Sequence, residues 1–240
     1  ISIFQDRIPS VAAFQLPFLF TDYDQARAAL YEGDYGYQLI GDVASLGFTV
    51  NGIVPDGFRV MTMNKKVESL ADMHGLKMRM PNLEIMVEIG NYLGFAVTPM
   101  SMTEVFSALE QGVIDGQENP PSTIRSQGWY EIQDYLLVSN HVFTSLFLCV
   151  NNDFYNSLDS ELQNILDEVI DETCAQIWDT AQTQAQEDLD YMSSEGGIEV
   201  YEPSDSFRQE MVEATAPMYD NMYETAPEVE EVINAIQAIQ

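Results

Sequence analysis

Residues 70–82 read LADMHGLKMRMPN, and they show the pattern of one strand followed by the start of one helix. Apolar side chains alternate with Lys77 and Arg79, which is the two-residue period of a strand, so the two basic side chains are expected on one face. Asn82 is a residue type that caps helices, and the sequence after it predicts a helix over about 82–93. A strand that passes directly into a helix is typical of α/β architecture.

The sequence on either side of this unit repeats the same alternation. A second strand is predicted over 58–63, and a second helix begins at a capping box of Ser101 and Glu104 and ends at Gly112. Short apolar runs alternate with amphipathic stretches up to about residue 155, and no linker separates independent domains. The fold class is therefore predicted to be α/β, with further strand residues at Val97, Val113 and Ile114.

The C-terminal third has a different, mostly helical pattern. From Asp159, apolar residues recur at helical spacing for about thirty residues, which predicts one long helix that the Gly196-Gly197 pair ends. Acidic side chains fill its other face, which is typical of a solvated surface rather than of a cation site. A short strand is expected over 198–201, followed by two amphipathic helices over about 205–239 that Pro227 separates.

Length and composition limit the classes of protein to be considered. The chain has 240 residues, of which 46% are hydrophobic and 11% aromatic, so it can build one large domain or two lobes, and global disorder is excluded. Thirty-nine acidic residues against nine basic ones give a net charge of −30, which argues against nucleic acid as a partner. No apolar run approaches the roughly 20 residues that cross a bilayer, so no direct membrane insertion is expected. The acidity is also compatible with adaptation to high salt.

Few groups in the sequence are suited to catalysis or to metal binding. It contains no GxSxG, GxGxxG, Walker-type or HExxH motif, and its only histidines are His74 and His141. Cys149 and Cys174 lie among apolar neighbours and are interpreted as buried free thiols, with one disulfide as the alternative. We therefore expect no catalytic residue, no metal site and no cofactor.

The basic residues are more informative than the acidic ones because they are concentrated. Five of the nine fall in the window 59–79, where only two acidic residues oppose them, so this window has a net charge of +3. Such a window attracts anions, and an arginine on a strand can hold a carboxylate with its planar guanidinium. The alternative is that these side chains only pair with surface carboxylates. The five residues are Arg59, Lys65, Lys66, Lys77 and Arg79.

Several ordered motifs together resemble those of one protein family. The 70–82 segment is followed at 98–120 by TPMSMTEVFSALEQGVIDGQENP, and the combination of KxRxP with DGQENP is specific. In these motifs the chain resembles the DctP-type solute-binding proteins of tripartite ATP-independent periplasmic (TRAP) transporters, and essentially all 240 residues fit. Shorter matching segments are LPFLF at 16–20, GFR at 57–59, WYEIQ at 129–133 and SNH at 139–141.

The resemblance implies a periplasmic receptor of two α/β lobes, with hinge crossings and a long bracing helix, that closes over a small organic acid. It would pass this acid to the membrane subunits of a TRAP permease, and it would not be an enzyme. Arg79 matches the family arginine that clamps the ligand carboxylate, whereas Asn119 and Arg59 match ligand contacts of sialic-acid binders. Asn82 is a further candidate, and Met102 stands where the family often places an aromatic ring against the ligand.

The resemblance also implies where the two lobes lie in the sequence. Lobe I would comprise residues 1–55 and about 145–185, and lobe II residues about 56–144 and 186–240. The family's opening strand and helix units would precede Ile1, so lobe I is expected to be incomplete within these 240 residues. A signal peptide would have been removed or would lie outside them.

Two other functions are compatible with the same residues. An enzyme acting on a carboxylate could use Arg79 as an anchor and Asp115, Glu118 or His141 as a general base, although the scarcity of histidine argues against it. The simpler interpretation of Asp115 and Glu118 is a turn residue and a structural hydrogen-bond acceptor. A sensory receptor for an organic acid would need the same pocket. Dicarboxylates, sugar acids, hydroxy or keto acids and sialic acids all offer the required carboxylate.

Overall fold

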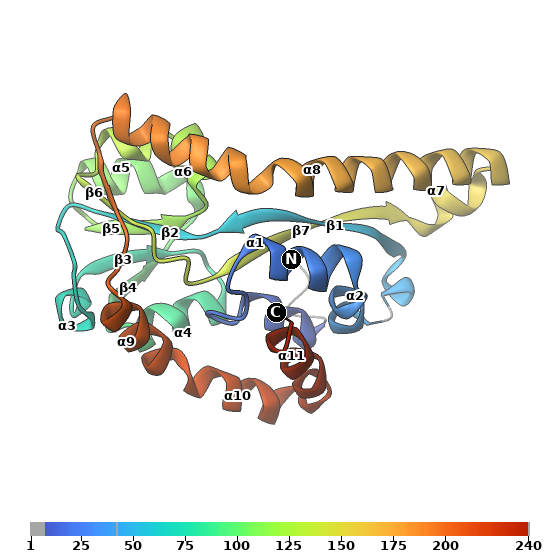
Figure 1. Cartoon of the computed structure of the whole chain (residues 1–240), viewed down its shortest axis with the longest axis horizontal. Coiled ribbons are helices and arrows are strands. Elements are labelled where there is room, and N and C mark those ends of the chain that lie inside the picture. Colours follow the sequence, from blue (N-terminus) through green and yellow to red (C-terminus); the bar gives the residue numbers. More distant parts are fainter. Residues whose placement is uncertain (1–7, 42, 240) are drawn as a thin grey trace.

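The computed structural model describes residues 8–41 and 43–239 of the chain. The chain forms two β-sheets of unequal size, and helices surround both (Figure 1). The smaller sheet pairs two long antiparallel strands, β1 (Phe48–Phe58) and β7 (Phe143–Asn151). The larger sheet has six strands in the order β4-β3-β5-β2-β6-β8. The predicted α/β class is confirmed. Residues 1–7, 42 and 240, which belong to the proposed lobes, lie outside the described residues.

The larger sheet is mixed. Strand β3 runs parallel to both of its neighbours, β4 and β5, while β2 is antiparallel to β5 and to β6, and β6 is parallel to β8. The strands predicted over 58–63, 76–80 and 198–201 are present, the first one divided at Arg59 between β1 and β2. The strands are β2 (Val60–Met63), β3 (Lys77–Met80), β4 (Ala96–Pro99), β5 (Gly116–Asn119), β6 (Tyr135–Leu137) and β8 (Glu199–Tyr201).

One predicted strand is misplaced. Val113 and Ile114 precede β5, which begins two residues later and consists of Gly116 followed by three polar residues. All four residues of β5 are buried because neighbouring strands flank it on both sides. The apolar pair is therefore not part of the sheet, and a central strand consists of residues whose polarity is typical of loops.

Helices follow the strands of the larger sheet, as predicted. The capping box of Ser101 and Glu104 is present. The expected cap at Asn82 is wrong, because the chain turns at Pro81 to Leu83, where the Leu83 N–H donates to the Pro81 carbonyl, and Leu83 becomes the N-cap. The elements are α3 (Leu70–Met73), α4 (Glu84–Tyr92), η5 (Met102–Glu104), α5 (Val105–Glu110), α6 (Pro121–Ser126) and η6 (Trp129–Glu131).

The predicted long helix is confirmed as α8 (Ser160–Ser194), which runs along one side of the molecule over β1 and β7 and reaches α6 (Figure 1). Near its middle, the Trp178 indole donates to the Ile53 carbonyl of β1 at 2.9 Å. Towards its end, the buried Asp188 accepts a 2.7 Å hydrogen bond from Arg125 of α6. One helix is thereby fixed to β1 of the smaller sheet and to α6, which follows β5 of the larger sheet.

Shorter helices complete the chain at both ends. The C-terminal region holds three helices rather than the predicted two, because Pro217 starts a new helix directly after α9. The elements are η2 (Pro9–Gln15), α1 (Tyr23–Arg27), the π-helical turn η3 (Ala28–Glu32), α2 (Tyr35–Ile40), η4 (Ala44–Leu46), α7 (Asn152–Ser157), α9 (Asp205–Thr215), α10 (Pro217–Thr225), η7 (Pro227–Val229) and α11 (Glu230–Gln237).

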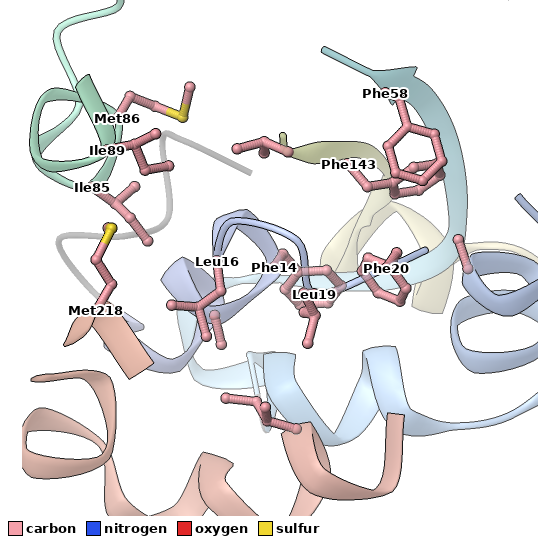
Figure 2. Packing of buried hydrophobic residues seen from close by; sticks show 14 of the residues in the cluster. Phe14, Leu16, Leu19, Phe20, Phe58, Ile85, Met86, Ile89, Phe143 and Met218 are labelled. Carbon is pink, nitrogen blue, oxygen red and sulfur yellow. The ribbon is translucent and has the colours of Figure 1, made fainter. Parts of the chain in front are cut away.

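One continuous hydrophobic cluster connects these parts. In Figure 2, Phe14 and Leu16 of the N-terminal segment lie between α4 residues on one side and Phe58 and Phe143 on the other, and Met218 of α10 approaches from below. Phe58 and Phe143 are at the ends of β1 and β7 where the chain passes between the sheets, and their rings make an edge contact at 4.9 Å. The crossings are therefore anchored in the core.

The two cysteines differ in their surroundings. Both are free thiols, so the disulfide alternative is not realised. Cys174 of α8 is buried against Gly52, as expected, but Cys149 of β7 is exposed, which corrects the prediction that both are buried. Within the described part of the chain, no helix is both long and apolar enough to span a membrane.

Candidate functional site

The candidate binding residues gather at one edge of the larger sheet. Strands β3, β4 and β5 are parallel, so their carboxyl ends meet at this edge, which is where open α/β sheets bind ligands. Arg79 pairs in register with Gln117, and Asn119 pairs with Val60 at the start of β2. The structure thus brings Arg59, Arg79 and Asn119 together from segments 20 and 40 residues apart.

The basic window divides into two groups in space. Lys77 is exposed at the opposite end of β3, where its backbone N–H donates to the Asp115 carboxylate. Lys66 reaches the Glu199 carboxylate at 2.6 Å, so the alternative of a surface ion pair holds for this residue. Of these residues, Arg59 and Arg79 lie at the carboxyl edge. Lys77 and Arg79 are two residues apart on β3, but Lys77 is exposed at the strand's start whereas Arg79 is buried.

Arg79 is a buried cation that lacks a counterion among the described residues. Its side chain is held by the Met100 carbonyl, which accepts from Nε at 3.1 Å and from Nη2 at 2.8 Å, and only 3% of the residue is exposed. Burial lowers the pKa of Arg79, the charge of Glu118 raises it and that of Arg59 lowers it. A guanidinium in this setting is stabilised by any carboxylate that approaches its free Nη1 side.

Arg59 has a partner already. Its Nε and Nη2 both bind the Glu118 carboxylate, Nη2 at 2.9 Å from Oε1, and Nη2 also donates to the Glu118 carbonyl at 2.8 Å. Burial by itself would raise the pKa of Glu118. The charge of Arg59 and the nearby His141 ring outweigh this effect, so the pKa of the Glu118 carboxyl lies below its ordinary value. His141 Nε2 lies 3.4 Å from Glu118 Oε2, and His141 Nδ1 lies 2.8 Å from the Ser139 hydroxyl.

Asn119 ends a chain of buried polar side chains. Its Nδ2 donates to Gln117 Oε1 at 2.8 Å, and Gln117 Nε2 donates to Thr62 Oγ1 at 3.0 Å. All three residues lie on adjacent strands, β5 and β2, and are buried. The chain of hydrogen bonds fixes the orientation of the Asn119 amide.

The two weaker candidates lie at the rim. Met102 follows β4 and is 42% exposed. Asn82 follows β3 and is exposed, but it lines a cavity of about 780 Å³ between η2, α4 and α10, which Arg79 and Asn119 do not line. Asn82 and Met102 therefore follow the ends of β3 and β4 but are exposed, whereas Arg59, Arg79 and Asn119 are buried.

Sequence reasoning missed the partners of the predicted residues. Glu118 is the counterion of Arg59, which agrees with its simpler interpretation as a structural hydrogen-bond acceptor, but the sequence did not identify Arg59 as its partner or Gln117 and Thr62 as the residues that orient Asn119. The signal was available in part, because three consecutive polar residues after a glycine are unusual inside an α/β sheet. Pairing them with Arg59 and Thr62 requires the register of β2 on β5.

Comparison with known proteins identifies the family and the fold of the chain. The family model "Bacterial extracellular solute-binding protein, family 7" (DctP) matches residues 1–226. A TRAP periplasmic solute-binding protein of Haemophilus influenzae, solved with bound L-gulonate, is 31% identical, with a TM-score of 0.86 over 98% of this chain and 77% of its own. A second, from Shewanella oneidensis with bound succinate, is 26% identical, with a TM-score of 0.90 over 99% of this chain and 77% of its own.

One relative found by sequence is named for the class of ligand that it binds. The C4-dicarboxylate-binding periplasmic protein DctP of Rhodobacter capsulatus is 30% identical over 88% of this chain and 63% of its own length, so this chain spans less than two thirds of it. The family model covers nearly all of the sequence, and the solved relatives share the two-lobed fold. The chain therefore belongs to the DctP family of TRAP solute-binding proteins.

Proposed function

We propose that this protein captures a small organic acid in the periplasm and delivers it to the membrane subunits of a TRAP permease. The observation that carries the proposal is Arg79, a buried guanidinium at the carboxyl edge of three parallel strands with no carboxylate partner among the described residues. The relatives named above bind L-gulonate, succinate and C4-dicarboxylates, and each of these ligands has a carboxylate to offer such a group.

In this proposal Arg79 is the clamp. The Met100 carbonyl fixes the plane of the guanidinium, so the free Nη1 and the second Nη2 hydrogen are oriented before the ligand arrives, and little side-chain entropy is lost on binding. Asn119 and Arg59 would contribute at the same edge, and Asn82 and Met102 would lie at its rim. Exclusion of water on closure would strengthen the ion pair.

Closure would bring lobe I over this edge. We place lobe I at residues 1–55 and about 145–185, and lobe II at about 56–144 and 186–240. With these bounds the chain crosses between the lobes within β1 near residue 55, within β7 near residue 144 and within α8 near residue 185. A few residues at such crossings can absorb the rotation of a hinge.

The alternative of an enzyme finds little support in the geometry. Glu118 is occupied by Arg59 at both carboxylate oxygens, which makes it a poor general base. Asp115 lies at the end of the sheet opposite Arg79, beside Lys77. The geometry thus supports binding better than proton transfer, and no specific observation favours a sensory receptor.

Calorimetry on the full natural protein tests the proposal, with L-gulonate and succinate as ligands. Truncating one partner of a desolvated ion pair costs at least about 2 kcal/mol, so Arg79→Ala should weaken affinity about thirtyfold or more. Arg79→Lys should bind nearly as badly because lysine lacks the planar fork. Lys77→Ala is the matched control on the same strand and should have a mild effect. Equal, mild effects of Arg79→Ala and Lys77→Ala would refute the clamp.

A further inference from the structure

A separate pocket lies between α8 and the end of β1, and we call it the α8 pocket. It has a volume of about 200 Å³, and Arg59, Arg79 and Asn119 do not line it. Its walls come from segments that we place in both lobes, so it lies where the lobes meet. The walls include Asp22, Phe58, Asn140, Gln182, Ala185 and Glu202.

The charged groups of the α8 pocket are anions. Asp22 and Glu202 bring two carboxylates, whereas no described lysine or arginine lines the pocket. Asp22 is partly occupied, because it accepts from the Gln25 N–H at 2.8 Å and from the Thr21 hydroxyl at 3.0 Å. The Glu202 side chain has no hydrogen bond or ion pair with another described residue. Burial raises the pKa of Glu202 and the charge of Arg208 lowers it, so a bound cation would stabilise the ionised carboxylate.

The rest of the pocket suits a compact apolar body that carries one charged group. Phe58 and Leu189 give it apolar walls. The side-chain amides of Asn140 and Gln182 have no hydrogen-bond partner in the described part of the chain, and their oxygens are acceptors. An ammonium group has three donors and a positive charge, so it can bind such oxygens and a carboxylate, whereas two carboxylates repel an anion.

We infer that the α8 pocket binds a small organic cation, a protonated amine on a compact apolar body, through Glu202 and the amide oxygens of Asn140 and Gln182. Helix α8 passes between the proposed lobes near residue 185, and Ala185 lines this pocket. An occupant that contacts both lobes stabilises the arrangement of the lobes in which the pocket has this shape. Binding of the amine is therefore coupled to closure over the organic acid, a consequence that rests on the proposed function.

The first test is calorimetry with benzylamine and benzyl alcohol on the full natural protein, at pH 7 and low salt. Benzyl alcohol has the same shape without the charge, so we expect benzylamine to bind at least about tenfold more tightly. Glu202→Gln should remove most of this preference. Glu199→Gln is the matched control, because Glu199 is exposed nearby on β8 and does not line the pocket. Equal binding of the two probes, or equal effects of the two variants, would overturn the inference.

A second pair of variants locates the amine. Ala185→Leu places a larger side chain in the pocket and should abolish benzylamine binding. Thr183→Leu is its control, because Thr183 is exposed on the same helix outside the pocket. Benzylamine binding that survives Ala185→Leu would place the amine elsewhere and overturn the inference. Thermal unfolding shows whether each variant is folded, and the comparison of the two probes on the wild type needs no variant.

The coupling to closure is measured separately. Saturating benzylamine should change the affinity for L-gulonate or succinate by about fivefold or more, and the acid should change the affinity for benzylamine by the same factor. Unchanged affinities would overturn the coupling. If neither acid binds, the proposed function fails, whereas the titrations of benzylamine still decide whether the amine site exists.

Discussion

Glu118 and Arg59 form a buried ion pair at the point where the chain leaves the smaller sheet for the larger one. Arg59 is the single residue between β1 and β2, and its backbone N–H also donates to the Val142 carbonyl of the second crossing. Glu118 is fully buried in β5 and Arg59 is 8% exposed. One carboxylate in the larger sheet thus holds the residue at which both crossings meet.

Removing the charge of Glu118 should be costly. Glu118→Gln keeps the shape but leaves Arg59 buried without a counterion, and breaking one side of a buried pair costs about 3 to 5 kcal/mol. Urea unfolding at pH 7 measures the loss of unfolding free energy. Glu199→Gln is the matched control because it breaks the exposed pair with Lys66, and solvent screening should make this loss much smaller. Similar losses in the two variants would contradict the role given to the pair.

The same pair predicts a dependence of stability on pH. The pKa of Glu118 is lower in the folded protein than its ordinary value of 4.5, so the unfolded chain binds the proton more tightly. This contribution to stability is present above pH 4.5 and is lost as the pH falls through the folded-state pKa. The difference in unfolding free energy between wild type and Glu118→Gln should therefore shrink below pH 4.5. A difference that stays constant from pH 7 down to pH 2 would show that ionisation of Glu118 is not its cause.

Much of the fold follows from local patterns in the sequence. Local patterns predicted the strand around Arg79, the capping box at Ser101 and the long helix, because periodicity and capping depend on residues that are close in the sequence. Strand β5 was not, since the polar residues of Gly116–Asn119 become buried only through contacts with β2 and β3 that are distant in sequence. The same limit applies to the site: Arg79 and Asn119 could be named, but the compensation of Arg59 by Glu118 is a tertiary contact.

Gly57 should be required at the first crossing. Its φ of 115° is a conformation that favours glycine, and a Cβ atom there would lie 2.8 Å from the Tyr23 hydroxyl. The Tyr23 ring makes edge contacts with Phe58 and Phe143 at 5.3 and 5.6 Å, so it cannot move away without disturbing the core. Gly57→Ala should lower stability by about 1 to 3 kcal/mol in thermal or urea unfolding.

Two variants separate the backbone strain from the steric contact. Gly75 also has a positive φ, but a Cβ atom there would meet nothing within 4 Å, so Gly75→Ala should cost only the backbone term, about 1 kcal/mol. Tyr23→Phe removes the hydroxyl that a Cβ at position 57 would meet, so Gly57→Ala should cost less in that background. An unchanged cost of Gly57→Ala in the Tyr23→Phe protein would exclude the hydroxyl as the obstacle.

The surface charge should make the protein more stable in salt. With a net charge of −30, repulsion between carboxylates extends over about 30 Å in 0.01 M salt and only about 3 Å in 1 M salt. We expect the melting temperature to rise over this range of sodium chloride. Glu168 and Glu172 are exposed one turn apart on α8, where like charges repel by roughly 0.2 to 0.5 kcal/mol. Replacing both with glutamine should raise the melting temperature in 0.01 M salt and leave it unchanged in 1 M salt. A wild-type melting temperature that is flat or falls with salt would exclude carboxylate repulsion as a significant cost to this fold.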